Sequence, residues 1–184
     1  MSFKSWFGKT MLKLKGWKMV GEIPEDIKKS VTIAAPHTSI EDFFIGRYYY
    51  WYIERPVRFL VKKEFFKPDC LGWLLRKLGG IPVDRSRASN VVSSVVEQFG
   101  KYDELNVVIT PEGTRKRTEH WKKGFYYIAL KANVPIIVGF MDFGNKICGT
   151  GPVIYPSGDF DADFKIIEDF YRGMKGKYPE RFNL

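Results

Sequence analysis

His37 and Asp42 lie five positions apart in the stretch "APHTSIEDFF" (35–44), which follows a short apolar run. A neutral imidazole can take a proton from a hydroxyl group when a carboxylate holds its other ring nitrogen. Five residues of continuous helix would separate the two side chains by about 140° around the axis, so they can meet only if His37 precedes a helix and Asp42 lies in its first turn. The spacing is therefore compatible with a general base and an orienting acid.

The same stretch also fits the start of a helix with no catalytic role. Thr38 to Glu41 matches the capping-box pattern T-x-x-E, and Ser39 to Asp42 matches S-x-x-D. In that interpretation His37 is a surface histidine. A His followed by an Asp at this spacing is expected by chance in roughly one sequence in ten. For this motif alone, both interpretations stay open.

A second segment, "VVITPEGTRKRTEHWKKG" (107–124), breaks a buried-looking apolar run with Pro111 to Arg115. Gly113 would permit a positive φ or a close backbone approach, and Arg115 offers the forked donors that bind phosphate oxygens. A solvated basic loop is the alternative. Further cations follow in the same loop at Lys116, Arg117, Lys122 and Lys123, and "GGIPVDR" (79–85) adds Arg85.

These motifs together resemble the glycerolipid acyltransferases of the 1-acylglycerol-3-phosphate acyltransferase type. His37 to Asp42 matches the H-x-x-x-x-D motif of that family, and "GGIPVDR", "TPEGTR" and "VPIIVGF" resemble its second, third and fourth blocks. The four blocks occur in the family's order and cover residues 31 to 140. The run Pro111 to Arg115 would seldom arise by chance, since each position matches at roughly one in twenty.

The resemblance implies that His37 is the catalytic base and that Asp42, rather than Glu41, is its partner. It also implies an acyl thioester as the donor substrate, acyl-CoA or acyl-carrier protein, with no metal and no bound cofactor. The residues it implies in binding the acyl acceptor and its phosphate are Arg85, Glu112, Gly113, Thr114 and Arg115.

Strand-like and helix-like segments alternate along the chain, which favours a single α/β domain with a largely parallel central sheet flanked by helices. In such sheets the sites lie at the carboxyl ends of strands, where His37 and "TPEGTRKR" both fall. Expected strands are 28–35, 57–62, 105–110, 134–140 and 148–155, and expected helices are 41–53, 69–78, 89–99, 124–132 and 161–174.

Lys and Arg outnumber Asp and Glu by 30 to 21 in the 184 residues, giving a net charge of +9. This excess indicates attraction to phosphate, either of nucleic acid or of lipid head groups. Cys70 and Cys148 show no metal-binding spacing, and we expect both to be buried and reduced. The longest apolar run, 134–141, is far shorter than the ~20 residues needed to span a bilayer.

Residues 1–18 have the pattern of a basic amphipathic helix. Phe3, Trp6, Phe7, Met11 and Leu14 recur at helical spacing, with lysines on the other side and no acid. Such a helix could pack on the protein's own core, but aromatic residues flanked only by lysines are typical of helices that lie in a membrane surface. We therefore predict a membrane-surface helix at 1–18 and an acyltransferase domain at 19–184.

The sequence predicts an O-acyltransferase of phospholipid biosynthesis, peripheral to the cytoplasmic face of a membrane with anionic lipids. It would transfer an acyl group to the hydroxyl of a lysophospholipid, with 1-acylglycerol-3-phosphate as the first choice and phosphatidate as its product. Another lysolipid, such as a lyso-aminolipid, is the alternative acceptor. A nucleic-acid-binding module ranks lower, and we expect no nucleic-acid partner, because charge alone does not explain the motifs. A serine hydrolase would need a G-x-S-x-G elbow, which the sequence lacks.

Overall fold

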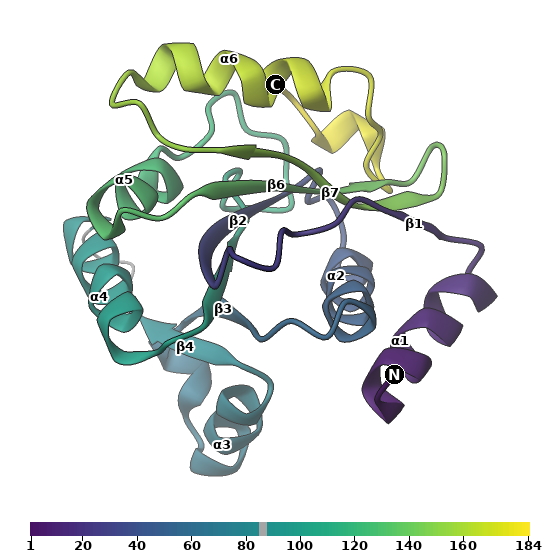
Figure 1. Ribbon diagram of the computed structural model, residues 1–184, viewed down its shortest axis with the longest axis horizontal. Helices are drawn as coiled ribbons and strands as arrows, with labels where there is room; N and C mark the ends of the chain where they lie inside the picture. The colour runs from purple at the N-terminus through teal and green to yellow at the C-terminus, as the bar shows by residue number, and fades with distance from the viewer. Residues whose placement is uncertain (85–87) are drawn as a thin grey trace.

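A seven-stranded sheet in the order β1-β7-β6-β2-β5-β3-β4 forms the centre of the protein (Figure 1). The computed structural model describes residues 1–84 and 88–184, so the predicted site residue Arg85 lies outside the described part. The strands are β1 (Lys18–Val20), β2 (Lys29–Ala35), β3 (Val57–Lys62), β4 (Gly80–Val83), β5 (Leu105–Ile109), β6 (Ile136–Asp142) and β7 (Ile147–Ile154).

Most of the strand pairs are parallel, which confirms the α/β class. The pairs β2–β6, β2–β5, β3–β5 and β3–β4 are parallel, β7 is antiparallel to β6, and β1 pairs parallel with β7. The edge strands β1 and β4 were not expected from the sequence. They contain 3 and 4 residues, too few for a period-two pattern to stand out, and Pro82 interrupts β4.

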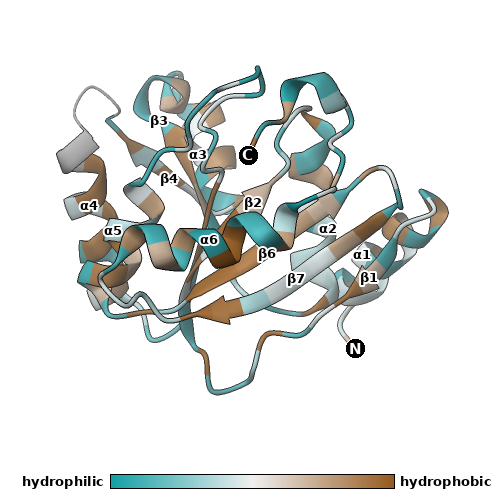
Figure 2. Ribbon diagram, turned by 90° about the horizontal axis from the view of Figure 1, so that it is seen from above, coloured by the Kyte–Doolittle hydropathy of each residue, from teal (hydrophilic) through white to brown (hydrophobic). Residues whose placement is uncertain are grey.

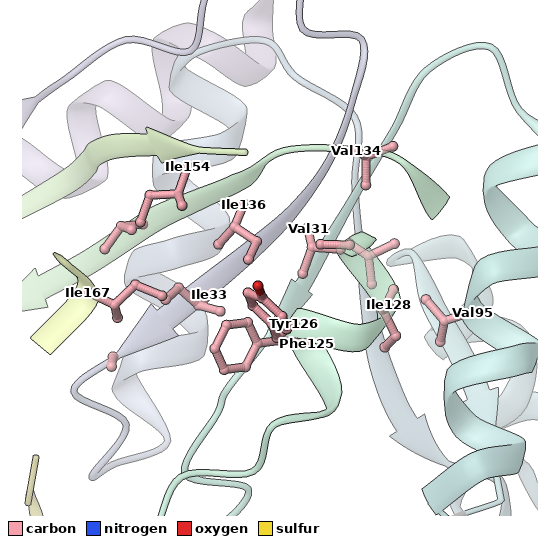
Figure 3. Close-up of a cluster of buried hydrophobic side chains, with 14 of the residues drawn as sticks. Val31, Ile33, Val95, Phe125, Tyr126, Ile128, Val134, Ile136, Ile154 and Ile167 are labelled. Atoms are coloured by element: carbon pink, nitrogen blue, oxygen red, sulfur yellow. The ribbon is translucent and has the colours of Figure 1, made fainter. Parts of the chain in front are cut away.

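Helices cover both faces of the sheet (Figure 1). They are α1 (Phe3–Leu14), α2 (Glu41–Tyr52), α3 (Asp69–Lys77), α4 (Ala88–Lys101), α5 (Gly124–Ala132) and α6 (Phe160–Tyr171), with short 3₁₀ turns η1 (Lys63–Phe66) and η2 (Pro179–Arg181). The core under α4, α5 and α6 includes Val31, Ile33 and Ile136 (Figure 3). A second core, under α1 and α2, includes Ile137 and Met141.

Strand β6 lies between these two cores, and all seven of its residues are buried. A strand that is covered on both faces reads as a continuous apolar run rather than an alternating one, as "VPIIVGF" does. Figure 2 shows this contrast, with β6 mostly in the hydrophobic colour and α6 alternating between hydrophobic and hydrophilic. The central strands thus form a rigid platform for the loops at their carboxyl ends.

Helix α1 packs on the domain through two small residues and one leucine. Ser5, Gly8 and Leu12 are its buried positions, and the Ser5 hydroxyl donates to the Tyr52 carbonyl at 2.8 Å. A Cβ atom on Gly8 would lie 2.4 Å from the Tyr48 carbonyl oxygen. The absence of a side chain at Gly8 therefore sets how closely the two helices approach.

The predicted apolar stripe of α1 is divided: Phe7 and Met11 are half-buried, with the Phe7 ring against Tyr48 and Trp51 of α2, and the other three members face solvent. Phe3, Trp6 and Leu14 are 76%, 52% and 77% exposed. The helix is therefore docked on the domain by one side and displays aromatic groups on another. Across residues 1–84 and 88–184, no helix combines the length and apolar character required to traverse a bilayer.

The two cysteines occupy different environments. Cys148 is buried in β7, and burial raises the pKa of its thiol to about 12. Cys70 is exposed on α3, so the expectation that both are buried is wrong for Cys70. The physical reason is that α3 packs on the domain through Gly72, on another side of the helix.

Substituting Gly8 tests the docking of α1. A Gly8→Ala methyl group would meet the Tyr48 carbonyl oxygen at 2.4 Å, so we expect the free energy of unfolding to fall by about 1–3 kcal/mol. Gly100 in α4 is the matched control, because a Cβ there meets no atom within 4 Å. Gly100→Ala should be neutral or stabilising by about 0.5–1 kcal/mol. Urea denaturation measures both, and equal stability of the two variants would contradict the tight contact.

Candidate active site

The carboxyl ends of the neighbouring central strands β2 and β5 lie side by side. The two strands are parallel neighbours, with Ile33 opposite Ile109 near their ends. Pro36 and His37 follow β2, and Thr110 to Arg115 follow β5. The structure therefore brings the two motif segments together, in the place where α/β sheets hold their sites.

The imidazole of His37 faces Asp42. The Nδ1 atom of His37 lies 3.2 Å from Oδ2 of Asp42, because α2 begins at Glu41 and His37 precedes it. Asp42 Oδ2 also accepts hydrogen bonds from the backbone N–H groups of Thr38 and Ser39, each at 2.8 Å. These contacts fix the carboxylate. Nδ1 is thereby oriented toward Asp42, and within the described part of the chain no group is hydrogen-bonded to Nε2.

Asp42 lies in the first turn of α2, and its carboxylate holds the segment before the helix as well as contacting the histidine, so a local structural role and a contact with His37 are not exclusive. Ser39 donates its hydroxyl to Oδ1 of Asp42 at 2.9 Å and accepts from the N–H of Glu41 at 3.0 Å. The carboxylate of Glu41 is instead paired with Lys177. Of the two neighbouring acids, Asp42 is the one in contact with His37.

The carboxyl group of Glu112 contacts the backbone of His37. Its Oε1 atom accepts a hydrogen bond from the His37 backbone N–H at 2.8 Å. The side chain is 2% exposed, and Oε2 has no hydrogen-bond partner among residues 1–84 and 88–184. Burial raises the pKa of this carboxyl to about 7. The resemblance implied a role in acceptor binding, whereas the structure places Glu112 against the backbone of His37 and outside the lining of either cavity described below.

The turn after Glu112 requires glycine. Gly113 has φ 66°, which confirms the expected positive φ, and a Cβ atom there would lie 2.8 Å from Cε of Lys122. Its N–H closes the turn by donating to the Thr110 carbonyl at 3.0 Å. Gly113, Thr114 and Arg115 then line the same cavity as His37.

That cavity has a volume of about 1180 Å³ and is lined mainly by apolar side chains. Part of its lining lies on the sheet face that α2 covers, including Phe43, Val57 and Met141, and part comes from α4 and α5, including Val91 and Ile128. Three residues before the end of β2, the hydroxyl of Thr32 accepts from Tyr50 Oη at 2.7 Å. The Nε atom of Arg47, another lining residue, is buried and has no partner in the described ranges.

A smaller cavity of about 370 Å³ adjoins the first, and Thr114 and Arg115 line both. Its other cations are Lys116, Lys177 and Arg181. The carboxyl-terminal segment folds back onto the start of α2, where the Tyr178 N–H donates to Thr38 Oγ1 at 3.2 Å. Lys177 and Arg181 belong to no motif and lie more than sixty residues beyond "PEGTR", so they could not be identified as site residues from the sequence.

Metal-binding groups are not clustered in the described residues: no three His, Cys, Asp or Glu side chains lie close enough together to hold an ion. The second histidine, His120, is exposed in the basic loop. The arrangement around His37 therefore offers proton transfer at Nε2, an apolar cavity and a cationic cavity, all at one edge of the sheet.

A model of the acyltransferase family matches residues 18–139, two thirds of the chain. The chain belongs to this family. The matched segment includes His37, Asp42 and the "PEGTR" turn, while Lys177 and Arg181 lie beyond it.

Two similar plant proteins are named 1-acyl-sn-glycerol-3-phosphate acyltransferase. The protein of Cocos nucifera is 32% identical over 106 residues, which cover 55% of this chain and 33% of the relative. The protein of Limnanthes douglasii is 31% identical over 119 residues, which cover 61% of this chain and 41% of the relative. The chain thus spans between a third and about two fifths of the length of these relatives.

The pH dependence of stability tests the burial of Glu112. Its pKa of about 7 in the folded protein lies above the unfolded value of about 4.3, so the folded state binds the proton more tightly. Stability is therefore lost as pH rises from about 4 to 7. Glu112→Gln keeps an oxygen for the His37 N–H and has no proton to lose. Relative to the wild type, we expect it to gain roughly 2–3 kcal/mol between pH 5 and 8.

Urea denaturation at several pH values measures this difference. Glu41→Gln is the control, because the ion pair with Lys177 lowers the pKa of Glu41. The contribution of the Glu41 carboxylate to stability is lost only as pH falls through that lowered pKa. Glu41→Gln should therefore leave the slope of unfolding free energy against pH unchanged between pH 5 and 8. Parallel curves for the wild type and Glu112→Gln would show that the carboxyl does not hold a proton near neutral pH.

Proposed function

We propose that this protein transfers a fatty acyl group from a thioester to the free hydroxyl of a lysophospholipid, most readily 1-acylglycerol-3-phosphate, giving phosphatidate. The observation that carries the proposal is the His37–Asp42 contact of 3.2 Å, at a point where a large apolar cavity adjoins a small cationic one. The family match and the printed names of the plant relatives support the same reaction.

In the proposed reaction His37 acts as the general base through Nε2. It takes the proton of the acceptor hydroxyl, and the oxygen attacks the thioester carbonyl. A carbon–oxygen bond forms, the carbon–sulfur bond breaks, and the thiolate leaves and takes up the proton from the imidazolium. Asp42 holds Nδ1 and stabilises the positively charged ring. The hydrogen bonds from the N–H groups of Thr38 and Ser39 keep the Asp42 carboxylate in position.

The two cavities suit the two ends of the substrates. An acyl chain fits the largely apolar cavity of about 1180 Å³ next to His37, and a phosphate fits the adjoining cavity. Arginine forks and lysine ammonium groups bind phosphate oxygens through charge-assisted hydrogen bonds. The four cations of the small cavity, Arg115, Lys116, Lys177 and Arg181, against the single acid Glu41, therefore favour a phosphate-bearing acceptor over a lyso-aminolipid, whose amine adds a positive charge.

The donor in this proposal is acyl-CoA or acyl-carrier protein, which present the same acyl thioester to His37. The residues placed around His37 carry out the transfer without a metal or bound cofactor. We further propose that the protein is peripheral to the cytoplasmic face of the membrane. The exposed Phe3 and Trp6 of α1, among lysines and without an acid in the helix, would lie in the surface of an anionic bilayer.

Replacing the base tests the reaction directly. His37→Ala should lower kcat by roughly 10²–10⁴-fold, because a positioned general base contributes about that much. The melting temperature should stay close to that of the wild type, since the His37 imidazole is partly exposed and its backbone contact with Glu112 remains. His120→Ala is the control. The assignment fails if His37→Ala retains normal turnover of a labelled acyl thioester while His120→Ala loses it.

Charge removal in the small cavity tests where the phosphate lies. Arg115→Ala and Arg181→Ala should each raise KM for a phosphate-bearing acceptor about tenfold, since a hydrogen bond to a charged group is worth roughly 1.5–3 kcal/mol. The KM of an acceptor without phosphate should change little. Arg172→Ala removes an exposed arginine that is paired with Asp169 and lines neither cavity, and it is the control. An unchanged KM in both cavity variants would move the phosphate site elsewhere.

A further inference from the structure

Helix α3 turns most of its apolar side chains toward solvent, while Leu75 is half-buried. Leu71, Trp73 and Leu74 are 38%, 58% and 46% exposed. The helix packs on the domain through Gly72, where a Cβ atom would lie 2.4 Å from the Phe66 carbonyl oxygen. A surface helix normally buries its apolar stripe, so the orientation of α3 is the reverse of the usual one.

Cationic residues flank these exposed residues in the sequence. Phe65, in the preceding turn η1, is also 56% exposed. The Nζ atom of Lys77 lies 4.1 Å from the centre of the Trp73 ring. We call the exposed Phe65, Leu71, Trp73 and Leu74 the α3 patch; the segment 62–77 that bears it contains five cations, Lys62, Lys63, Lys67, Arg76 and Lys77, against the acids Glu64 and Asp69.

The α3 patch belongs to the same side of the molecule as α1. In Figure 1 both helices lie below the sheet with α2 between them, whereas α6 lies above it. Helix α2 itself exposes Ile40, immediately before its start, and Phe44, which are 59% and 47% exposed. The large cavity is bounded by α2 and by β3, the strand that leads into η1 and α3. Exposed apolar groups therefore occur on α2, which lines that cavity, and on α3, which follows a strand that lines it.

We propose that the α3 patch is a second insertion point, in addition to α1, by which the protein binds the surface of an anionic bilayer. A bilayer fits better than a protein partner, because lysine is depleted in protein interfaces, whereas lysines beside Trp and Leu are typical of helices in a membrane surface. Each cation near the surface adds attraction to anionic lipids. Two insertion points hold α2 and the cavity beneath it at a fixed orientation to the lipid; this last step rests on the proposed function.

Cys70 allows the proposal to be tested without altering the patch. It is the exposed cysteine on α3, whereas Cys148 is buried with its thiol pKa raised to about 12, so a nitrobenzoxadiazole label at pH 7 attaches to Cys70. We expect vesicles of phosphatidylcholine with phosphatidylglycerol to shift the label's emission to the blue and increase it. Vesicles of phosphatidylcholine alone should have a much smaller effect.

The matched control places the same label on α6, through Ile166→Cys in a Cys70→Ser background. Ile166 is 50% exposed, and its label should report no change of polarity. The proposal is overturned if anionic vesicles sediment the protein while the Cys70 label stays unchanged, or if the two labels respond equally.

Substitutions measure how much the patch contributes to binding. Leu71→Ser, Trp73→Ser and Leu74→Ser combined should weaken partitioning into anionic vesicles by roughly tenfold or more, and adding Phe3→Ser and Trp6→Ser should weaken it further. Ile166→Ser should have no effect. If the triple variant binds vesicles as well as the wild type, α1 alone anchors the protein; if it does not fold, the Cys70 label decides.

Failure of this proposal can be told apart from failure of the proposed function. The triple variant should keep the wild-type rate on a short-chain acceptor that is dispersed as monomers, because no α3 residue lies near His37. Insertion of the Cys70 label by a protein that acylates none of the lysolipids tested would leave the α3 surface standing and remove the reaction.

Discussion

Strands β2 and β5 run in parallel with Ser30 opposite Asn106, and the two buried side chains are hydrogen-bonded at 2.6 Å. Asn106 also donates from Nδ2 to the carbonyl of Pro56, just before β3. A slip of one residue would turn each side chain to the other face and leave these buried polar groups unpaired. The register set at the start of the strands therefore determines that their carboxyl ends arrive together, which is how the N–H of His37 reaches Glu112.

The long strands and the local motifs of this arrangement could be predicted from the sequence. Contacts between residues far apart in the sequence could not. Apolar runs at 28–35 and 105–110 identified β2 and β5, and the change from strand to helix at Pro36 placed His37 at an edge of the sheet. Sequence alone did not separate Asp42 from Glu41, because both lie in the first turn; the family resemblance favoured Asp42. The inward orientation of Glu112 and the return of Lys177 and Arg181 depend on tertiary packing, for which neither periodicity nor motif gives a signal.

The two amphipathic helices show a related limit. A 3.6-residue period identifies a helix and its apolar stripe, but it does not decide whether that stripe faces the core or the solvent. In α1 and α3 a glycine makes the close contact, at Gly8 and Gly72, and the rings of Phe3, Trp6 and Trp73 stay exposed. Docking through backbone leaves the larger side chains free for another surface, which is also why Cys70 is exposed.

The carboxyl-terminal segment reaches the start of α2 across 136 residues of chain, in the ion pair of Lys177 with Glu41. Near the end of the segment, the Asn183 carbonyl accepts a hydrogen bond from the Trp121 indole N–H at 2.9 Å. This bond attaches the segment to the basic loop. On a ribosome that adds about 5–20 residues per second, Lys177 and Arg181, which line the small cavity, would be synthesised roughly 7–30 s after α2. During that interval the nascent chain carries His37 and Asp42 without the completed cationic cavity, so the order of synthesis separates the appearance of the base from that of its proposed phosphate site.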